Sequence, residues 1–190
     1  LVFKARFKQG DIYRKMGHWE PARGTYEQII RDFPDHPDIW SVRMALADSL
    51  SAQAGSDPAL QENASVIYER LRDVASASEE LRIEAGFKAG SALVRRDRSD
   101  RGAELWWQVV DEFLIQNETP SNLGTKGRYW LARTLAQLGE VLERQGKLIG
   151  ARRAYELMRS RGLPEAEWAT EQLRRLGGAR SEENTPVVDE

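Results

Sequence analysis

His18 and His36 are the only two histidines in the 190 residues, and the sequence contains no cysteine. Metal binding or histidine-based catalysis would therefore depend on these two side chains. They fall in separate predicted turns, one after Gly17 and the other after Pro34, and no H-E-x-x-H pattern is present. We interpret both histidines as turn residues that cover helix ends, and we expect neither a metal site nor a catalytic residue.

Two other patterns resemble functional sites, but each has a simpler explanation. Residues 139–147 contain two glycines and a lysine, as a nucleotide phosphate loop does, but their spacing is too long and Leu148 replaces the Ser or Thr that would meet magnesium. Glu79 and Glu80 are adjacent, so on a helix their carboxylates diverge by about 100° instead of sharing a site. The sequence therefore predicts no cofactor and no enzyme activity.

A cluster of charged residues leaves two interpretations open. Four arginines and two aspartates lie close together: Arg95, Arg96, Asp97, Arg98, Asp100 and Arg101. They form either a solvated corner between helices, in which each ion pair contributes little, or a docking patch for an acidic partner. We expect the solvated corner.

Composition excludes several classes of partner. Hydrophobic residues make up 41% and charged residues 31% of the chain, and the net charge is −2. Such a charge gives no overall field that would recruit nucleic acid. No stretch approaches the roughly 18 apolar residues of a membrane-spanning helix. We expect a protein or peptide partner, no nucleic acid and no direct membrane insertion.

The apolar residues recur with the 3.6-residue period of amphipathic helices, and no strand pattern is present. In four places an alanine is followed one helical turn later by a large aromatic residue: Ala22 and Tyr26, Ala64 and Tyr68, Ala103 and Trp107, Ala151 and Tyr155. Alanine at this position favours a close helix crossing, because a larger side chain would push the two axes apart.

Two of these units share a longer pattern. The separation from Gly10 to Ala22 is the same as the separation from Gly139 to Ala151. Gly17 follows Gly10 at the same separation at which Gly146 follows Gly139. A proline ends each unit, Pro34 in the first and Pro164 in the second. This pattern resembles the tetratricopeptide repeat, a helix–turn–helix unit of about 34 residues. The resemblance implies a right-handed, all-α solenoid of about nine antiparallel helices with a concave binding face.

The predicted organisation is four degenerate helix pairs, a capping helix and a tail. Each step from one of the four alanines to the next exceeds the repeat length of about 34 residues, so we expect insertions near 51–60 and 115–125. The predicted solenoid domain spans 1–178, with a flexible tail at 179–190. Its units are repeats at about 2–36, 37–75, 78–114 and 121–163, and a capping helix at 164–177 that ends at Gly177 and Gly178.

The sequence contains six tryptophans, whose burial the repeat pattern also predicts. We expect four of them in the core: Trp19, Trp40, Trp107 and Trp168. Trp130 follows Tyr129 directly, and a helix cannot bury two neighbouring side chains on one narrow face. One member of that pair is therefore expected at the surface.

The resemblance also implies which residues line the concave face, since the first helix of each repeat does so in this family. The candidate partner-binding residues are Phe7, Asp11, Arg14, Lys15, Arg95, Arg96, Arg133 and Glu140. Some family members clamp a C-terminal carboxylate with Lys and Asn one turn apart, but here Phe7 and Asp11 occupy those positions. We single out Phe7, Arg14 and Arg133 as the strongest candidates.

The predicted function is a non-catalytic protein–protein interaction scaffold. Two alternatives stay open: a structural spacer or assembly arm of a larger envelope protein, and an accessory module of an enzyme whose catalytic domain precedes residue 1. Short stretches such as 29–37 resemble repeats of bacterial cell-envelope scaffolds, which points to the periplasm, with the cytoplasm as the alternative. The sequence predicts neither the partner nor the oligomeric state.

Overall fold

The computed structural model describes residues 1–55, 57–116 and 123–182, with side chains described up to residue 177. These ranges contain nine α-helices, one short π-helical segment and no strand. The all-α prediction is confirmed. The helices are α1 Val2–Lys15, α2 Trp19–Asp32, α3 Ile39–Ala54, α4 Pro58–Asp73, α5 Glu79–Arg95, α6 Ser99–Val110, α7 Thr125–Arg144, α8 Leu148–Ser160 and α9 Ala166–Glu182, and the π-helical segment Asp111–Ile115 extends α6.

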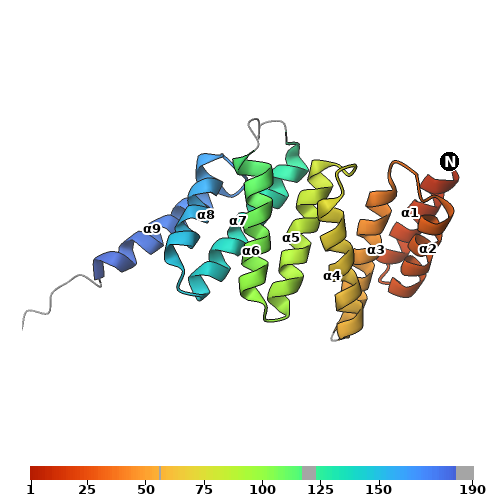
Figure 1. The fold of residues 1–190 in the computed structure, drawn as a ribbon, viewed down its shortest axis with the longest axis horizontal. Helices are drawn as coiled ribbons and strands as arrows, with labels where there is room; N and C mark the ends of the chain where they lie inside the picture. The colour runs from red at the N-terminus through yellow and green to blue at the C-terminus, as the bar shows by residue number, and fades with distance from the viewer. Residues whose placement is uncertain (56, 117–122, 183–190) are drawn as a thin grey trace, which may run out of the picture.

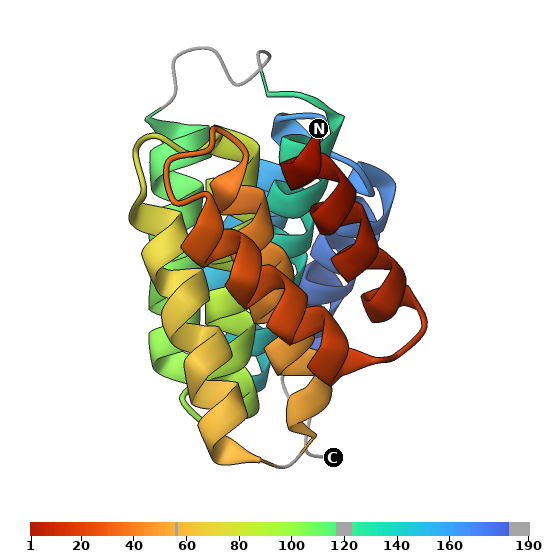
Figure 2. The same ribbon diagram turned by 90° about the vertical axis from the view of Figure 1, so that its right-hand side faces the viewer.

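The helices form an elongated stack, with α1 and α2 at one end and α9 at the other (Figure 1). Each helix packs against the next one in the chain. The first helices of successive pairs, α1, α3, α5 and α7, also contact one another in that order. Seen from the end of the stack, the later helices lie behind the earlier ones (Figure 2). Four pairs and a last helix on α8 therefore make a helical-repeat solenoid, as predicted.

Two hydrophobic cores meet at α5. One core extends from Phe3 of α1 to α5 and includes Tyr26 and Tyr68. The other extends from Ile83 of α5 to Leu176 of α9. Because α5 contributes buried side chains to both, it joins the two halves of the stack.

Glycines on three first helices accept a large ring from the helix that follows. The separation in sequence between the glycine and its ring is the same in all three cases. The ring lies where a side chain would otherwise project, so only glycine allows the two helices to come this close. An ideal Cβ would lie 2.5 Å from the ring of Tyr26 at Gly10, 2.2 Å from that of Trp106 at Gly90, and 2.3 Å from that of Tyr155 at Gly139.

This register corrects the prediction for the third repeat. Trp106 is the buried ring, with 1% of its surface exposed, whereas Trp107 is only half-buried. The small residue at the crossing is Gly102, and a Cβ there would lie 2.9 Å from the carbonyl oxygen of Gly90. The predicted pair of Ala103 and Trp107 is therefore one residue out of register. The separation from Gly90 to Trp106 equals that from Gly10 to Tyr26, so the sequence already contained the signal for the correct register.

The turn after the first helix requires a left-handed residue. Gly17 and Gly146 provide it with φ angles of 74° and 71°. In the third repeat the equivalent position, counted from Gly90, is Asp97 with a φ of 58°. A non-glycine residue is less favourable in this conformation, although aspartate tolerates it better than most.

Two predicted boundaries differ from the structure. The insertion at 51–60 is not a loop, because α3 continues to Ala54 and α4 starts at Pro58 with Asp57 as its N-cap; the extra residues lengthen the helices. The last helix continues beyond Gly177 to Glu182, so 179–182 belong to α9. Of the predicted linker, 117–122 lie outside the described residues, as do 183–190 of the predicted tail.

The tryptophans also differ from the prediction. All four that were expected in the core are half-buried: Trp19, Trp40, Trp107 and Trp168. A tryptophan side chain is large, so it is rarely buried completely. Tyr129 and Trp130 divide as expected, since Tyr129 is exposed and Trp130 is half-buried.

Candidate functional site

A groove of about 800 Å³ runs along the layer of first helices. We call it the central groove. Arg14 of α1 and Trp19 of α2 lie at one end, and Arg144 at the end of α7 lies at the other. Helices α3, α5 and α7 supply most of its wall, so residues far apart in the sequence face one hollow. The repeat architecture is what brings them together.

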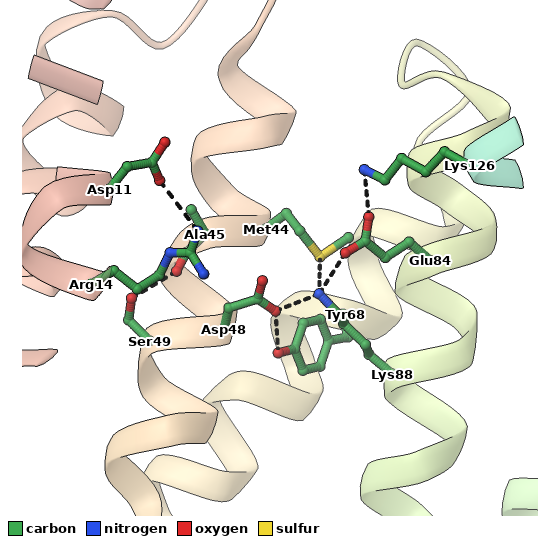
Figure 3. Close-up of polar contacts among 10 residues, drawn as sticks. All are labelled: Asp11, Arg14, Met44, Ala45, Asp48, Ser49, Tyr68, Glu84, Lys88 and Lys126. Atoms are coloured by element: carbon green, nitrogen blue, oxygen red, sulfur yellow. Dashed lines mark hydrogen bonds and ion pairs between the residues drawn. The ribbon is translucent and has the colours of Figure 1, made fainter. Parts of the chain in front are cut away.

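The N-terminal half of the groove contains a charge network around Lys88, shown in Figure 3. Lys88 Nζ donates to Asp48 Oδ1 and to Glu84 Oε1, both at 2.6 Å. Asp48 Oδ1 also accepts from the Tyr68 hydroxyl at 2.8 Å. Lys126 Nζ pairs with the other oxygen of Glu84 at 2.7 Å. We call these five residues the Lys88 network; they connect α3, α4, α5 and α7.

The centre of the network is largely removed from water, whereas the Lys126 side chain is 55% exposed. The Glu84 side chain is 9% exposed and that of Lys88 is 18% exposed. Burial by itself would raise the pKa of Glu84, but the ammonium groups of Lys88 and Lys126 outweigh it and hold that pKa below its ordinary value. Burial, together with the Asp48 carboxylate, raises the pKa of Tyr68. The Glu84 carboxylate is therefore held in its charged form by the two lysines, while the Tyr68 hydroxyl stays neutral.

A smaller hollow of about 200 Å³ adjoins this half and contains Phe7, Asp11 and Arg14. Asp11 accepts from the Tyr26 hydroxyl at 2.9 Å and lies 3.6 Å from Arg14. Phe7 is half-buried, with its ring edge-on to Tyr26 at a centroid distance of 6.0 Å. The alignment that makes Phe7 a candidate places it on a solvent-facing position of the concave face. The structure corrects this, because Tyr26 already covers much of the ring.

The C-terminal half of the central groove has a different electrostatic character. Arg133 and Arg144 of α7 line it together with Arg95 of α5, which also borders a hollow beside α3 and α4, and none of the three forms an ion pair within the part of the chain that the structure describes. The Arg133 guanidinium lies over the Phe87 ring, 5.6 Å from its centroid. Glu140 is the acidic residue on this side.

Apolar side chains lie between these arginines. Val94 of α5, Trp106 of α6 and Val141 of α7 face the groove. Ser91 and Gln137 connect α5 to α7 through a hydrogen bond of 3.2 Å. The C-terminal half therefore combines an apolar floor with cationic walls.

The charged cluster at 95–101 does not act as one surface. Arg95 faces the central groove, whereas Arg96, Arg98 and Arg101 line a separate hollow of about 270 Å³ together with glutamates of α4 and α6. Arg96 pairs with one of these, Glu62. The solvated-corner interpretation therefore describes most of the cluster, and Arg95 is the exception.

The eight candidate residues thus divide into groups. Four of them line the central groove: Arg14, Arg95, Arg133 and Glu140. Phe7 and Asp11 line the adjoining hollow, with Arg14 at the junction between the two. Lys15 is exposed in the last turn of α1, and Arg96 belongs to the separate hollow.

Alignment of the repeats also puts Asp48 and Lys88 on the concave face, but nothing in the sequence marks the other three residues of the Lys88 network as site residues: Tyr68, Glu84 and Lys126. Tyr68 was recognised only as a core ring. The buried tyrosines donate to acidic residues at no constant separation, from Tyr155 to Glu143 at 2.6 Å and from Tyr68 to Asp48 at 2.8 Å. Without a fixed spacing, the sequence offers no signal that would select these acids.

The histidines have structural contacts. His36 stacks on Phe3 with a centroid distance of 3.5 Å, and its Nδ1 accepts from the backbone of Asp38 at 3.1 Å. His18 precedes the first residue of α2. Across the described residues, no group of three or more metal-binding side chains comes together. Over the same part of the chain, no helix has the length and hydropathy to cross a membrane.

Comparison with known proteins supports the repeat assignment. Residues 4–36, which comprise most of α1, all of α2 and the turn after it, match the family model of the tetratricopeptide repeat. Within this segment the first helix pair matches a tetratricopeptide repeat, and the described residues as a whole form an all-α array of helix pairs. The resemblance stated from Gly10 and Ala22 is thereby confirmed.

Two solved structures are similar over nearly the whole chain. Both are of Podosopora anserina putative kinesin light chain nearly identical TPR-like repeats, and one of them carries a single substitution. Each shares 19% identity and a TM-score of 0.49; the coverage is 95% of this chain and 97% of the other for the substituted protein, and 94% and 96% for the second structure. No curated protein matches the chain. These comparisons give no support to the bacterial cell-envelope interpretation.

Proposed function

We propose that the chain is a non-catalytic protein-binding module that holds an extended segment of a partner in the central groove, which we take to be the predicted concave face. The observation that carries this proposal is the continuity of the groove. One hollow of about 800 Å³ receives side chains from α1 through α7 and offers both apolar and charged contacts. Stacked helical repeats bind partners through extended surfaces of this kind.

The candidate residues take specific places in this proposal. Arg14, Arg95, Arg133 and Glu140 contact the segment in the central groove. Phe7 and Asp11 extend the surface into the adjoining hollow, where they contact a longer segment. Lys15 and Arg96 lie at the periphery and contribute little.

The test is to block the groove without changing the core. Ala52 of α3 is exposed and Gln137 of α7 is half-buried, and both line the groove. Peptides are first selected from a random-sequence display library on the wild-type chain. We expect the double change Ala52→Trp and Gln137→Trp to weaken their binding by more than about tenfold, because the two rings fill the space of the segment.

A matched control places the same rings on the opposite layer. Ala59 of α4 and Gln28 of α2 are exposed residues of second helices. The double change Ala59→Trp and Gln28→Trp should leave peptide affinity within about twofold of wild type. The proposal is wrong if no peptide is selected, or if both double variants bind equally well.

The assembly-arm alternative has one observation in its favour. Val2 and Ile12 of α1 and Met16, which follows its last residue, are 56%, 49% and 61% exposed, which leaves apolar surface at the first end of the stack. If that end contacts another protein, Ile12→Glu and Met16→Glu should abolish the contact while peptide binding in the groove is kept. Sedimentation equilibrium of wild type and variant at increasing concentration would detect self-association through this face.

A further inference from the structure

We infer that the partner segment is acidic, and that its carboxylates bind in the C-terminal half of the central groove, between Arg95, Arg133 and Arg144. This inference rests on the proposed function and specifies the chemistry of the partner. Five basic and two acidic side chains line the groove, for a formal charge of +3, whereas the whole chain has a net charge of −2. The local positive charge is therefore opposite in sign to that of the molecule.

The basic side chains of the groove also differ in whether they are free to bind a ligand carboxylate. In the N-terminal half, Lys88 is already neutralised by Asp48 and Glu84 at 2.6 Å each. Arg14 lies 3.6 Å from Asp11. A ligand would have to displace these internal partners, and breaking a largely buried pair is costly. This half gives little attraction to an incoming carboxylate.

In the C-terminal half no such displacement is needed. The three arginines line the hollow without an ion pair to any described residue. Arg133 is held against the Phe87 ring, which fixes its guanidinium before a ligand arrives. A fork of donors that is already positioned loses less side-chain entropy on binding a carboxylate than a free one does.

The floor between the arginines determines the rest of the ligand. Val94, Trp106 and Val141 face the same space. Trp106 and Val141 are buried, so an apolar side chain of the partner packs mainly on Val94, which is half-buried, while acidic residues on either side reach the arginines. The segment that fits is thus an extended peptide with glutamate or aspartate flanking one apolar residue. A nucleic acid fits less well, because the net charge of −2 provides no longer-range attraction for a polyanion.

The experiment uses the whole chain and fluorescent peptides of about twelve residues. The acidic probe has four glutamates around one leucine, and the neutral probe has glutamines in their place. Fluorescence anisotropy should show the acidic probe binding at least about tenfold more tightly, with an affinity that falls as salt is added. Amidation of its C-terminus should not change the affinity, because the arginines hold side-chain carboxylates.

Three sets of variants locate the site. The triple change Arg95→Ala, Arg133→Ala and Arg144→Ala should reduce affinity for the acidic probe by about tenfold or more. The same three arginines changed to lysine should bind more tightly than the alanine variant but less tightly than wild type, because the charge is kept while the fork of donors is lost. A helical circular dichroism spectrum of both variants shows that the chain still folds. A charge-matched control changes three exposed arginines on second helices to alanine: Arg31, Arg70 and Arg159. It should bind within about twofold of wild type.

Failure of this inference can be told apart from failure of the proposed function. One outcome is that the selected peptides do not bind the Ala52→Trp and Gln137→Trp variant but bind the triple arginine variant as well as wild type. In that case the groove binds a segment that is not acidic. Equal binding of the acidic probe to the groove and control arginine variants overturns the inference. Tighter binding of a polyuridine oligonucleotide than of the acidic probe overturns it as well.

Discussion

The two halves of the central groove are built from the same helices but use charge in opposite ways. In the N-terminal half, Lys88, Asp48 and Glu84 satisfy one another and connect the helices. In the C-terminal half, Arg95 and Arg133 keep their charge facing the hollow. Charge that is paired internally stabilises an arrangement of helices, whereas charge that is left unpaired is available for a ligand. A repeat array can thus hold a structural region and a binding region in one continuous groove.

The largest expected difference between the halves is in stability. Lys88→Met leaves Asp48 and the nearly buried Glu84 without their shared cation, so we expect the free energy of unfolding to fall by about 2–3 kcal/mol. Arg133→Met removes a cation from the face of Phe87 but leaves no unpaired acid, so its cost should stay below about 1 kcal/mol. Urea denaturation of both variants measures the difference, and equal costs would show that the halves do not differ.

The second prediction concerns α5, which joins the two cores. Gly90→Ala places a methyl group on the Trp106 ring, and we expect a loss of about 2 kcal/mol because the helices must move apart. Gly24→Ala is the matched control. Gly24 is an exposed residue of α2, and nothing lies within 4 Å of the added Cβ. It should stabilise by about 0.5–1 kcal/mol through helix propensity.

Hydrogen exchange refines this prediction. Because α5 contributes to both cores, Gly90→Ala should increase exchange in α3 and in α7 alike. An increase confined to one side would mean that the two halves unfold separately.

The third prediction uses acid to weaken one half selectively. The pKa of Glu84 is lowered in the folded chain from an ordinary value of 4.5, so its contribution to stability is complete above that value and is lost as the pH falls through the folded pKa. The stability advantage of wild type over Glu84→Gln should therefore shrink by about 1 kcal/mol between about pH 7 and about pH 3. The arginines of the other half stay charged throughout.

Thermal unfolding of both proteins across this pH range measures that advantage. An advantage that stays constant with pH would mean that the Glu84 carboxylate contributes nothing through its charge. Arg133→Met is the comparison from the other half, and its stability difference from wild type should show no such pH dependence.

The smallest expected effect lies in the turn after α5. Asp97 holds a left-handed φ of 58° where the first and fourth repeats have glycine. Asp97→Gly removes that strain but adds flexibility to the unfolded chain, so we expect a net gain of about 0.5 kcal/mol. Differential scanning calorimetry resolves a gain of this size as a small rise in Tm. A loss of stability would show that the aspartate side chain favours this turn.

Local sequence signals were sufficient for the helical repeat architecture. The period of the apolar residues and the equal spacing of Gly10 to Ala22 and Gly139 to Ala151 predict helix pairs, because both follow from contacts within one repeat. The third repeat was placed one residue out of register, since Ala103 and Trp107 satisfy the same short pattern as the true pair of Gly102 and Trp106. Only the approach of Trp106 to Gly90 distinguishes the two.

The division of the groove was decided by the tertiary structure alone. Asp48 and Lys88 are 40 residues apart, and the stacking angle of α3 on α5 determines that they meet. Arg95 lines the central groove and Arg96 does not, although both border a hollow beside α3 and α4, because successive side chains on a helix diverge by about 100°. Sequence by itself predicts that charged side chains gather on the first helices. The packing of those helices decides which of these charges neutralise one another and which remain for a partner.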